Sequence, residues 1–216
     1  MNATRVIVST LGVLTGISGI NHGFFEALQG NHSTGGFIIN AVGKGNSWTV
    51  WKNGGEGAFT VIPNFLLTGI LTIIVGALLI GWSIAFIHKK RGSTVFLLIA
   101  LMLFLLGGGV AQIPFIILTW AVATRINKPL NWWKKAFSAD FRKSIANKWV
   151  GLLIVSCFMV LLALELAIFG FFPYVTDLNL LQLICWSNLS GGAVILLISI
   201  IAGFEYDSEH KVISKS

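Results

Sequence analysis

The chain has 216 residues, of which 55% are hydrophobic and 11% are charged, and it carries a formal net charge of +7 at pH 7. Charged residues make up roughly 25% of an ordinary soluble domain, so this composition excludes a typical water-soluble protein and predicts a membrane protein. Because no nucleic-acid recognition motif accompanies the positive charge, we expect no nucleic acid as a partner.

Five apolar segments are each longer than the ~20 residues that an α-helix needs to cross a bilayer. They cover residues 6–28, 58–87, 94–124, 149–172 and 178–204. Transmembrane β-strands would instead be short and would alternate in polarity. The chain is therefore expected to be all-α, a polytopic transmembrane helical bundle that forms a single membrane domain over residues 1–216.

The first segment combines a face of small residues with a polar face. Its glycines follow one another at intervals of four, three and four residues, at Gly12, Gly16, Gly19 and Gly23. At about 100° per residue they fall within one narrow arc. Another helix can pack very closely there, as it does at small-residue stripes in other membrane proteins.

His22 and Glu26 occupy the neighbouring polar face, four residues apart and therefore adjacent on a helix. Ionisable side chains inside a membrane segment are costly and mark functional sites. The pair is a candidate site for a proton, a cation or a hydrogen-bonding ligand, and the alternative is an ordinary hydrogen-bonded pair near the membrane interface. Two ligands with no further His or Cys pair do not make a zinc-type site, so we predict no metal centre.

The third segment, residues 94–124, is too long for one straight helix across a bilayer. As a continuous helix it would extend about 46 Å, against about 30 Å of hydrocarbon. Gly107, Gly108, Gly109 and Pro114 lie in its middle and weaken a helix there. Two interpretations remain, a hairpin that breaks at these glycines and returns to the side it entered, or one tilted and kinked helix.

The fifteen basic residues discriminate between topologies, because cytoplasmic loops collect Lys and Arg. With the N-terminus inside and the third segment a hairpin, thirteen lie inside and only Lys44 and Lys52 lie outside. Five single crossings place eleven inside when the N-terminus is outside, and four when it is inside. We therefore expect a multi-pass protein of the cell membrane with both termini cytoplasmic and residues 30–57 as an extracytoplasmic loop.

Residues 125–148 are the most basic stretch of the chain and are expected to be a cytoplasmic interfacial segment. Aromatic residues recur there every four positions between Lys and Arg, which is typical of an amphipathic helix against anionic lipid headgroups. This predicted surface anchor consists of Trp133, Lys134, Lys135, Phe137, Phe141, Arg142 and Lys143. An anionic bilayer surface is thus the expected partner.

Glu165 lies within the fourth apolar segment with no basic residue near it in sequence. An unpaired carboxylate at that depth is costly, so Glu165 must carry a proton or face a partner or water, and His22 is the candidate partner. In the hairpin topology three further polar residues reach the depth of these acids. They are Asn64, Gln182 and Asn188.

Three functions remain open on this pattern. The first, which we predict, is binding or translocation of a small ligand, ion or proton through an outward-facing polar site, with a homo-oligomer where transport requires one. The second is an accessory or structural subunit that binds a membrane partner through the glycine face. The third is a membrane enzyme acting on a lipid-like substrate, with Glu165 or His22 as general acid or base.

Overall fold

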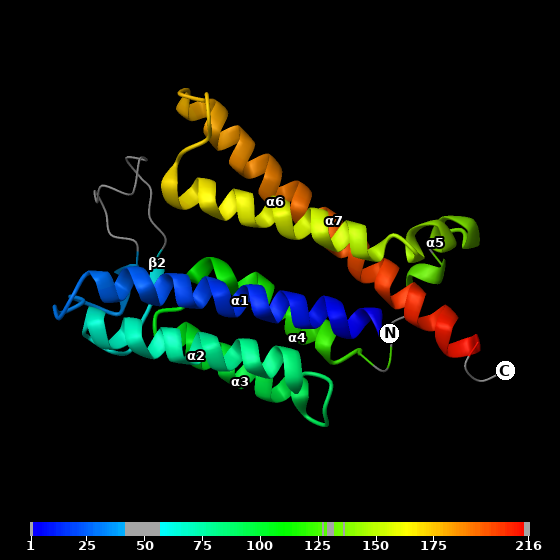
Figure 1. Cartoon of the computed structure of the whole chain (residues 1–216), viewed down its shortest axis with the longest axis horizontal. Coiled ribbons are helices and arrows are strands. Elements are labelled where there is room, and N and C mark those ends of the chain that lie inside the picture. Colours follow the sequence, from blue (N-terminus) through cyan, green and yellow to red (C-terminus); the bar gives the residue numbers. More distant parts are fainter. Residues whose placement is uncertain (1, 42–56, 127, 129–131, 136, 214–216) are drawn as a thin grey trace. The chain divides into compact units, whose positions relative to one another are not determined.

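A computed structural model describes residues 2–41, 57–126, 128, 132–135 and 137–213 of the chain. Within them the fold is helical apart from one short antiparallel sheet, formed by β1 (Ile38–Asn40) and β2 (Gly57–Phe59). Two 3-10 turns, η1 (Val110–Gln112) and η2 (Trp132–Lys135), interrupt the helical segments. The α-helices, shown in Figure 1, are α1 (Ala3–Leu28), α2 (Phe65–Ala85), α3 (Gly92–Leu105), α4 (Ile113–Ala123), α5 (Ala139–Ala146), α6 (Trp149–Phe169) and α7 (Leu178–Ile213).

Four of the described helices are long and apolar enough to cross a membrane, judged by length and composition: α1, α2, α6 and α7. The helical membrane class expected from the sequence agrees with this finding. The predicted count of five is not confirmed, because the third segment forms two shorter apolar helices, α3 and α4. At 1.5 Å per residue these helices extend only about 21 and 17 Å, less than the thickness of the hydrocarbon core.

The chain divides into two compact units. Unit 1 comprises residues 1–7, 124–166 and 171–216, and so contains the first turn of α1, α5, most of α6 and α7. Unit 2 comprises residues 8–123 and 167–170, and so contains the rest of α1, α2, α3, α4 and the small sheet.

In unit 2, α1 and α2 run antiparallel and meet at glycines. Gly16 lies against Gly76, and Gly23 lies against Gly69. A Cβ on Gly23 would stand 2.5 Å from the carbonyl oxygen of Gly69, and a Cβ on Gly69 would stand 2.5 Å from that of Gly23. Backbones approach this closely only where side chains are absent, so these four glycines set the separation of the two helices.

The other two glycines of the predicted face contact side chains. Gly12 lies against Ser83 of α2, whose carbonyl oxygen also accepts a hydrogen bond from Ser9 at 2.8 Å. Gly19 lies against Leu103 of α3. The small-residue face of α1 is therefore covered by helices of the same unit.

Residues 94–124 form a broken hairpin, since α3 and α4 pack against each other. After α3, Gly107 and Gly109 have φ angles of 120° and 32°, values that a residue with a Cβ rarely adopts. Pro114 follows in the first turn of α4, where its missing N–H would have had no partner in the helix. The break predicted at these glycines is thus the end of one helix, a turn and the start of another.

The segment before α2 holds this break from one side. Thr60 pairs with Leu106 in an isolated antiparallel bridge, and the Val61 N–H donates to the Leu105 carbonyl at 2.9 Å. Gln29, which directly follows α1, donates from Nε2 to the carbonyls of Asn40, the last residue of β1, and of Ala41. The predicted loop 30–57 therefore includes β1, while residues 42–56 lie outside the described residues.

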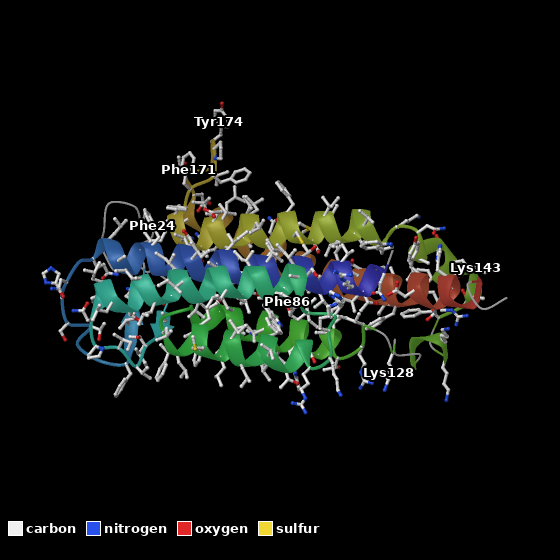
Figure 2. The ribbon with its side chains drawn as sticks, turned by 60° about the horizontal axis from the view of Figure 1, so that its bottom comes forward. Phe24, Phe86, Lys128, Lys143, Phe171 and Tyr174 are labelled. Atoms are coloured by element: carbon white, nitrogen blue, oxygen red, sulfur yellow. The ribbon has the colours of Figure 1, made fainter. Side chains whose placement is uncertain are left out.

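In unit 1, α6 and α7 form an antiparallel pair. The Ser199 hydroxyl donates to the Trp149 carbonyl at 3.0 Å, and Gly192 lies against Val160 farther along the pair. Figure 2 shows Lys128 and Lys143 at one end of this unit, and Phe171 and Tyr174 at its other end, in the turn between α6 and α7. The unit is therefore basic at one end and aromatic at the other.

The first turn of α1 is capped by α7. Asp207 accepts hydrogen bonds from the backbone N–H groups of Ala3 and Thr4 at 2.7 and 2.9 Å, and from the Thr4 hydroxyl at 2.6 Å. The first N–H groups of a helix lack partners within it and together carry partial positive charge. Because α1 has no acidic residue in its own first turn, the distant carboxylate of Asp207 supplies the acceptor.

Glu205, two residues before Asp207, joins α7 to the basic segment. It is buried, and its carboxylate lies 3.3 Å from Arg142 Nε and 3.9 Å from Lys134 Nζ. A buried carboxylate requires such partners, because removal of its counter-charges leaves an uncompensated charge. Part of the positive charge predicted to face lipid is therefore directed inward to Glu205.

The surface anchor differs from the continuous helix that its pattern indicated. The side chain of Ser138 accepts a hydrogen bond from the Phe141 N–H at 3.3 Å and caps α5, which therefore starts at residue 139. Phe137 and Phe141 lie against each other, both exposed. Of the remaining anchor residues, Lys134, Lys135 and Lys143 are exposed, Arg142 is half-buried, and the side chain of Trp133 lies outside the described part of the chain.

Gly69→Ala is expected to lower the unfolding free energy by about 1–3 kcal/mol, the usual cost of overpacking. The new Cβ would stand 2.5 Å from backbone atoms of both Gly23 and Ala27. Thermal unfolding in detergent measures the effect. Gly81→Ala in the same helix, where no atom lies within 4 Å of the added Cβ, is the matched control, and equal midpoints for the two variants would contradict the prediction.

Asp207→Ala should destabilise the protein by about 1–2 kcal/mol, because the first N–H groups of α1 lose their cap. The same unfolding measurement tests this. Asp140→Ala removes an exposed carboxylate from the first turn of α5 and should cost much less. The prediction is wrong if both substitutions shift the midpoint equally.

Candidate functional site

The polar face of α1 is directed at the break between α3 and α4. His22 and Glu26 are buried, with 2% and 0% of their surfaces exposed. One turn before His22, Ser18 accepts a hydrogen bond from Gln112 Nε2 of η1 at 3.0 Å. One turn after it, Glu26 reaches Gly107, so successive turns of α1 follow the break.

The carboxyl of Glu26 rests on the backbone of Gly107. A Cβ at position 107 would stand 2.5 Å from both Oε1 and Oε2 of Glu26, and the φ angle of 120° is one that favours glycine. Glycine is therefore required at this position for two reasons, the backbone conformation and the approach of the carboxyl group.

Two threonines of α2 complete the surroundings of the acid. Thr68 and Thr72 are fully buried, and both hydroxyls donate to the carbonyl oxygen of Leu106. The hydroxyls of Thr60 and Thr68 also share a hydrogen bond of 2.6 Å. The Thr72 hydroxyl donates to the Leu106 carbonyl and also lies within hydrogen-bonding reach of the Glu26 carboxyl. The site thus joins α1, α2 and the C-terminal end of α3.

The backbone N–H groups of the break donate to acceptors other than Glu26. The N–H groups of the three glycines that follow Leu106 all donate to backbone carbonyls of α3 or of the break itself. Neither oxygen of Glu26, nor Oε1 of Gln112, accepts a hydrogen bond from any residue that the structure describes. Because buried polar atoms are normally hydrogen-bonded, the site is rich in acceptors and poor in donors.

Asn64, a predicted member of the site, caps a helix. Its Oδ1 accepts a hydrogen bond from the Leu67 N–H at 3.0 Å at the start of α2, and its Nδ2 donates to Asn31 Oδ1 at 2.7 Å. Both contacts fix the entry of the chain into α2, so the described contacts of Asn64 are structural.

The remaining predicted site residues belong to unit 1. Glu165 of α6 and Gln182 of α7 are exposed. Asn188 is half-buried and donates to the Ile184 carbonyl of its own helix at 2.8 Å. Their participation in a site with His22 stays a prediction.

Thr68 and Thr72 were missed by the sequence reasoning. Residues four apart share one face of a helix, and Gly69 and Gly76 mark the neighbouring face of α2 as a contact surface. Together, the threonine spacing and the glycines could have predicted that the two hydroxyls are buried. Hydroxyls in helices often bond to a carbonyl of their own helix, as Thr15 does to Leu11. A pair of threonines therefore does not by itself predict a contact with another helix.

Among the described residues, no group of three or more His, Cys, Asp or Glu side chains is placed to hold a metal ion. No protein-family model matches the chain, and no curated protein or solved structure is similar to it. The chemistry of the Glu26 site is therefore the basis on which function is inferred.

Proposed function

We propose that the chain is an integral membrane protein that binds or translocates a small ligand, an ion or a proton at the site formed by His22 and Glu26. The observation that carries this proposal is the burial of the Glu26 carboxyl against Gly107, at a helix break. A buried carboxyl either takes up a proton or pairs with a positively charged species. Broken helices within membranes form the substrate and ion sites of many transporters.

We place both termini in the cytoplasm and the α3–α4 hairpin as a re-entrant element of the cell membrane. Each arm is too short to cross the hydrocarbon, and thirteen of the fifteen basic residues then lie inside. The exposed Phe171 and Tyr174 (Figure 2) suit the outer interface, where aromatic residues are enriched. Glu26, near the C-terminal end of α1, then lies in the outer half of the bilayer, and its site opens outward.

The basic end of unit 1 then meets the cytoplasmic leaflet. Phe137 and Phe141 are exposed beside Lys135 and Lys143, a combination that binds the headgroup region of anionic membranes. The bilayer surface is thus the partner that we propose for this segment.

The contacts of α1 weigh against an accessory subunit docked through the glycine face. Gly16 and Gly23 already pack on α2 of the same chain. A partner helix would have to displace α2 to use this face, so binding at Glu26 is the better supported function.

Cysteine labelling tests the topology. In a background without Cys157 and Cys185, Lys90→Cys and Lys135→Cys should react with a membrane-impermeant maleimide from the cytoplasmic side, and Ser33→Cys from the outside. Native residues at all three positions are exposed. Right-side-out and inside-out vesicles give the two readings, and labelling of positions 90 and 135 from opposite faces would exclude the re-entrant hairpin.

Glu26→Gln is expected to abolish ion or proton movement through the protein, because the amide removes the negative charge at the site. Proteoliposomes with an enclosed pH-sensitive dye report proton flux under an imposed pH, Na⁺ or K⁺ gradient. Wild-type vesicles should exceed empty vesicles several-fold, and Glu26→Gln vesicles should match empty ones.

Asp140→Asn is the matched control, since it makes the corresponding carboxylate-to-amide change at an exposed position. It should retain the wild-type rate. The proposed function is wrong if Glu26→Gln retains that rate under every gradient.

A further inference from the structure

The identity of the species that binds at the Glu26 site is a question that rests on the proposed function. We infer that the Glu26 site binds a dehydrated monovalent metal cation of the Na⁺ class. Its ligands are oxygen atoms, from the Glu26 carboxylate and from the hydroxyl and carbonyl groups that meet at Thr72 and Leu106.

The hydrogen-bond directions at the site call for a positive charge. Both threonine hydroxyls point their protons at Leu106, so the Thr72 oxygen presents lone pairs towards the neighbouring carboxyl. Glu26 likewise offers only acceptor oxygens when ionised. Facing lone pairs repel each other unless a cation or the acid's own proton lies between them.

The end of α3 adds partial negative charge at the same place. Helix C-termini carry about half a negative charge from their last carbonyl groups, and α3 ends at Leu105, next to the Leu106 carbonyl. Half-helix C-terminal ends and unwound carbonyls coordinate Na⁺ in transporters with broken helices. Because the N–H groups of the three glycines are bonded to backbone carbonyls, the break offers no donors to an anion.

The charge and the ligand type select the class of cation. Carboxylate, carbonyl and hydroxyl oxygens are hard ligands, which suit alkali and alkaline-earth ions better than soft transition metals. Within the described residues, Glu26 is the acidic side chain that touches the break. One carboxylate balances one positive charge, whereas a divalent ion would leave an uncompensated charge in the interior.

Thermal unfolding of the full chain in detergent tests this inference. Replacement of choline chloride by NaCl at constant ionic strength should raise the midpoint by about 3 °C or more, as a ligand of the folded state does. Thr72→Val, which keeps the side-chain shape and removes one ligand oxygen, should lose most of this rise, and Glu26→Gln should lose all of it.

Thr15→Val is the matched control, because Thr15 is a buried threonine whose hydroxyl bonds to its own helix at Leu11. It should keep the full rise with NaCl. A rise of equal size in all variants would overturn the inference. Calorimetric titration of the wild-type protein with NaCl does not depend on the folding of any variant, and absence of saturable heat would also overturn it.

The two proposals fail separately. Proton flux that depends on Glu26 in vesicles, without stabilisation by NaCl in detergent, would retain the proposed function and reject the metal cation in favour of a proton. Stabilisation by NaCl supports the cation site if it is seen in the wild type and in Thr15→Val and is lost in Thr72→Val and Glu26→Gln.

Discussion

The close approach of helix backbones in unit 2 is the constraint on which the site depends. Gly16 and Gly23 allow α1 to lie directly against α2, and this small separation holds Glu26 beside Thr72. Gly107 then permits the carboxyl to touch the break. A larger side chain at any of these glycines would move an acidic group relative to the oxygens that surround it. The packing of the helices and the chemistry of the site are therefore one property of unit 2.

Local patterns predicted the parts of this arrangement that depend on local physics. The spacing of the α1 glycines identifies a close-packing face, because helix periodicity alone aligns them. The run of glycines at 107–109 predicts a break, since helix propensity falls there. The partner helix and the two threonines were not predicted, because those contacts join residues far apart in sequence that carry no local signature.

Acidic residues show the same limit of sequence reasoning. Glu165 stands out within an apolar segment, yet it is exposed on α6. Glu205 and Asp207 follow the last apolar segment and look like ordinary solvated charges, yet both are buried. Their partners, Arg142 and the first turn of α1, lie far away in sequence. Burial of a charge depends on tertiary contacts, so hydropathy along the chain does not separate these cases.

Two of the three acidic residues of α7, Glu205 and Asp207, bind different kinds of partner. Glu205 binds cationic side chains, whereas Asp207 binds the backbone amides of a helix. Since α7 is 36 residues long, its polar end extends beyond the apolar part and supplies both carboxylates from one rigid element. Through Glu205, this end of α7 pairs with Arg142 and Lys134 at the basic end of unit 1.

The bond between Asp207 and Ala3 joins residues 204 positions apart, and this separation has a consequence for biosynthesis. Because translation runs from the N-terminus, the amides of α1 are synthesised well before the carboxylate that they bind. The first N–H groups of α1 therefore lack this acceptor until α7 has been synthesised. A nascent chain that stalls before α7 emerges would leave that turn to water or to a chaperone.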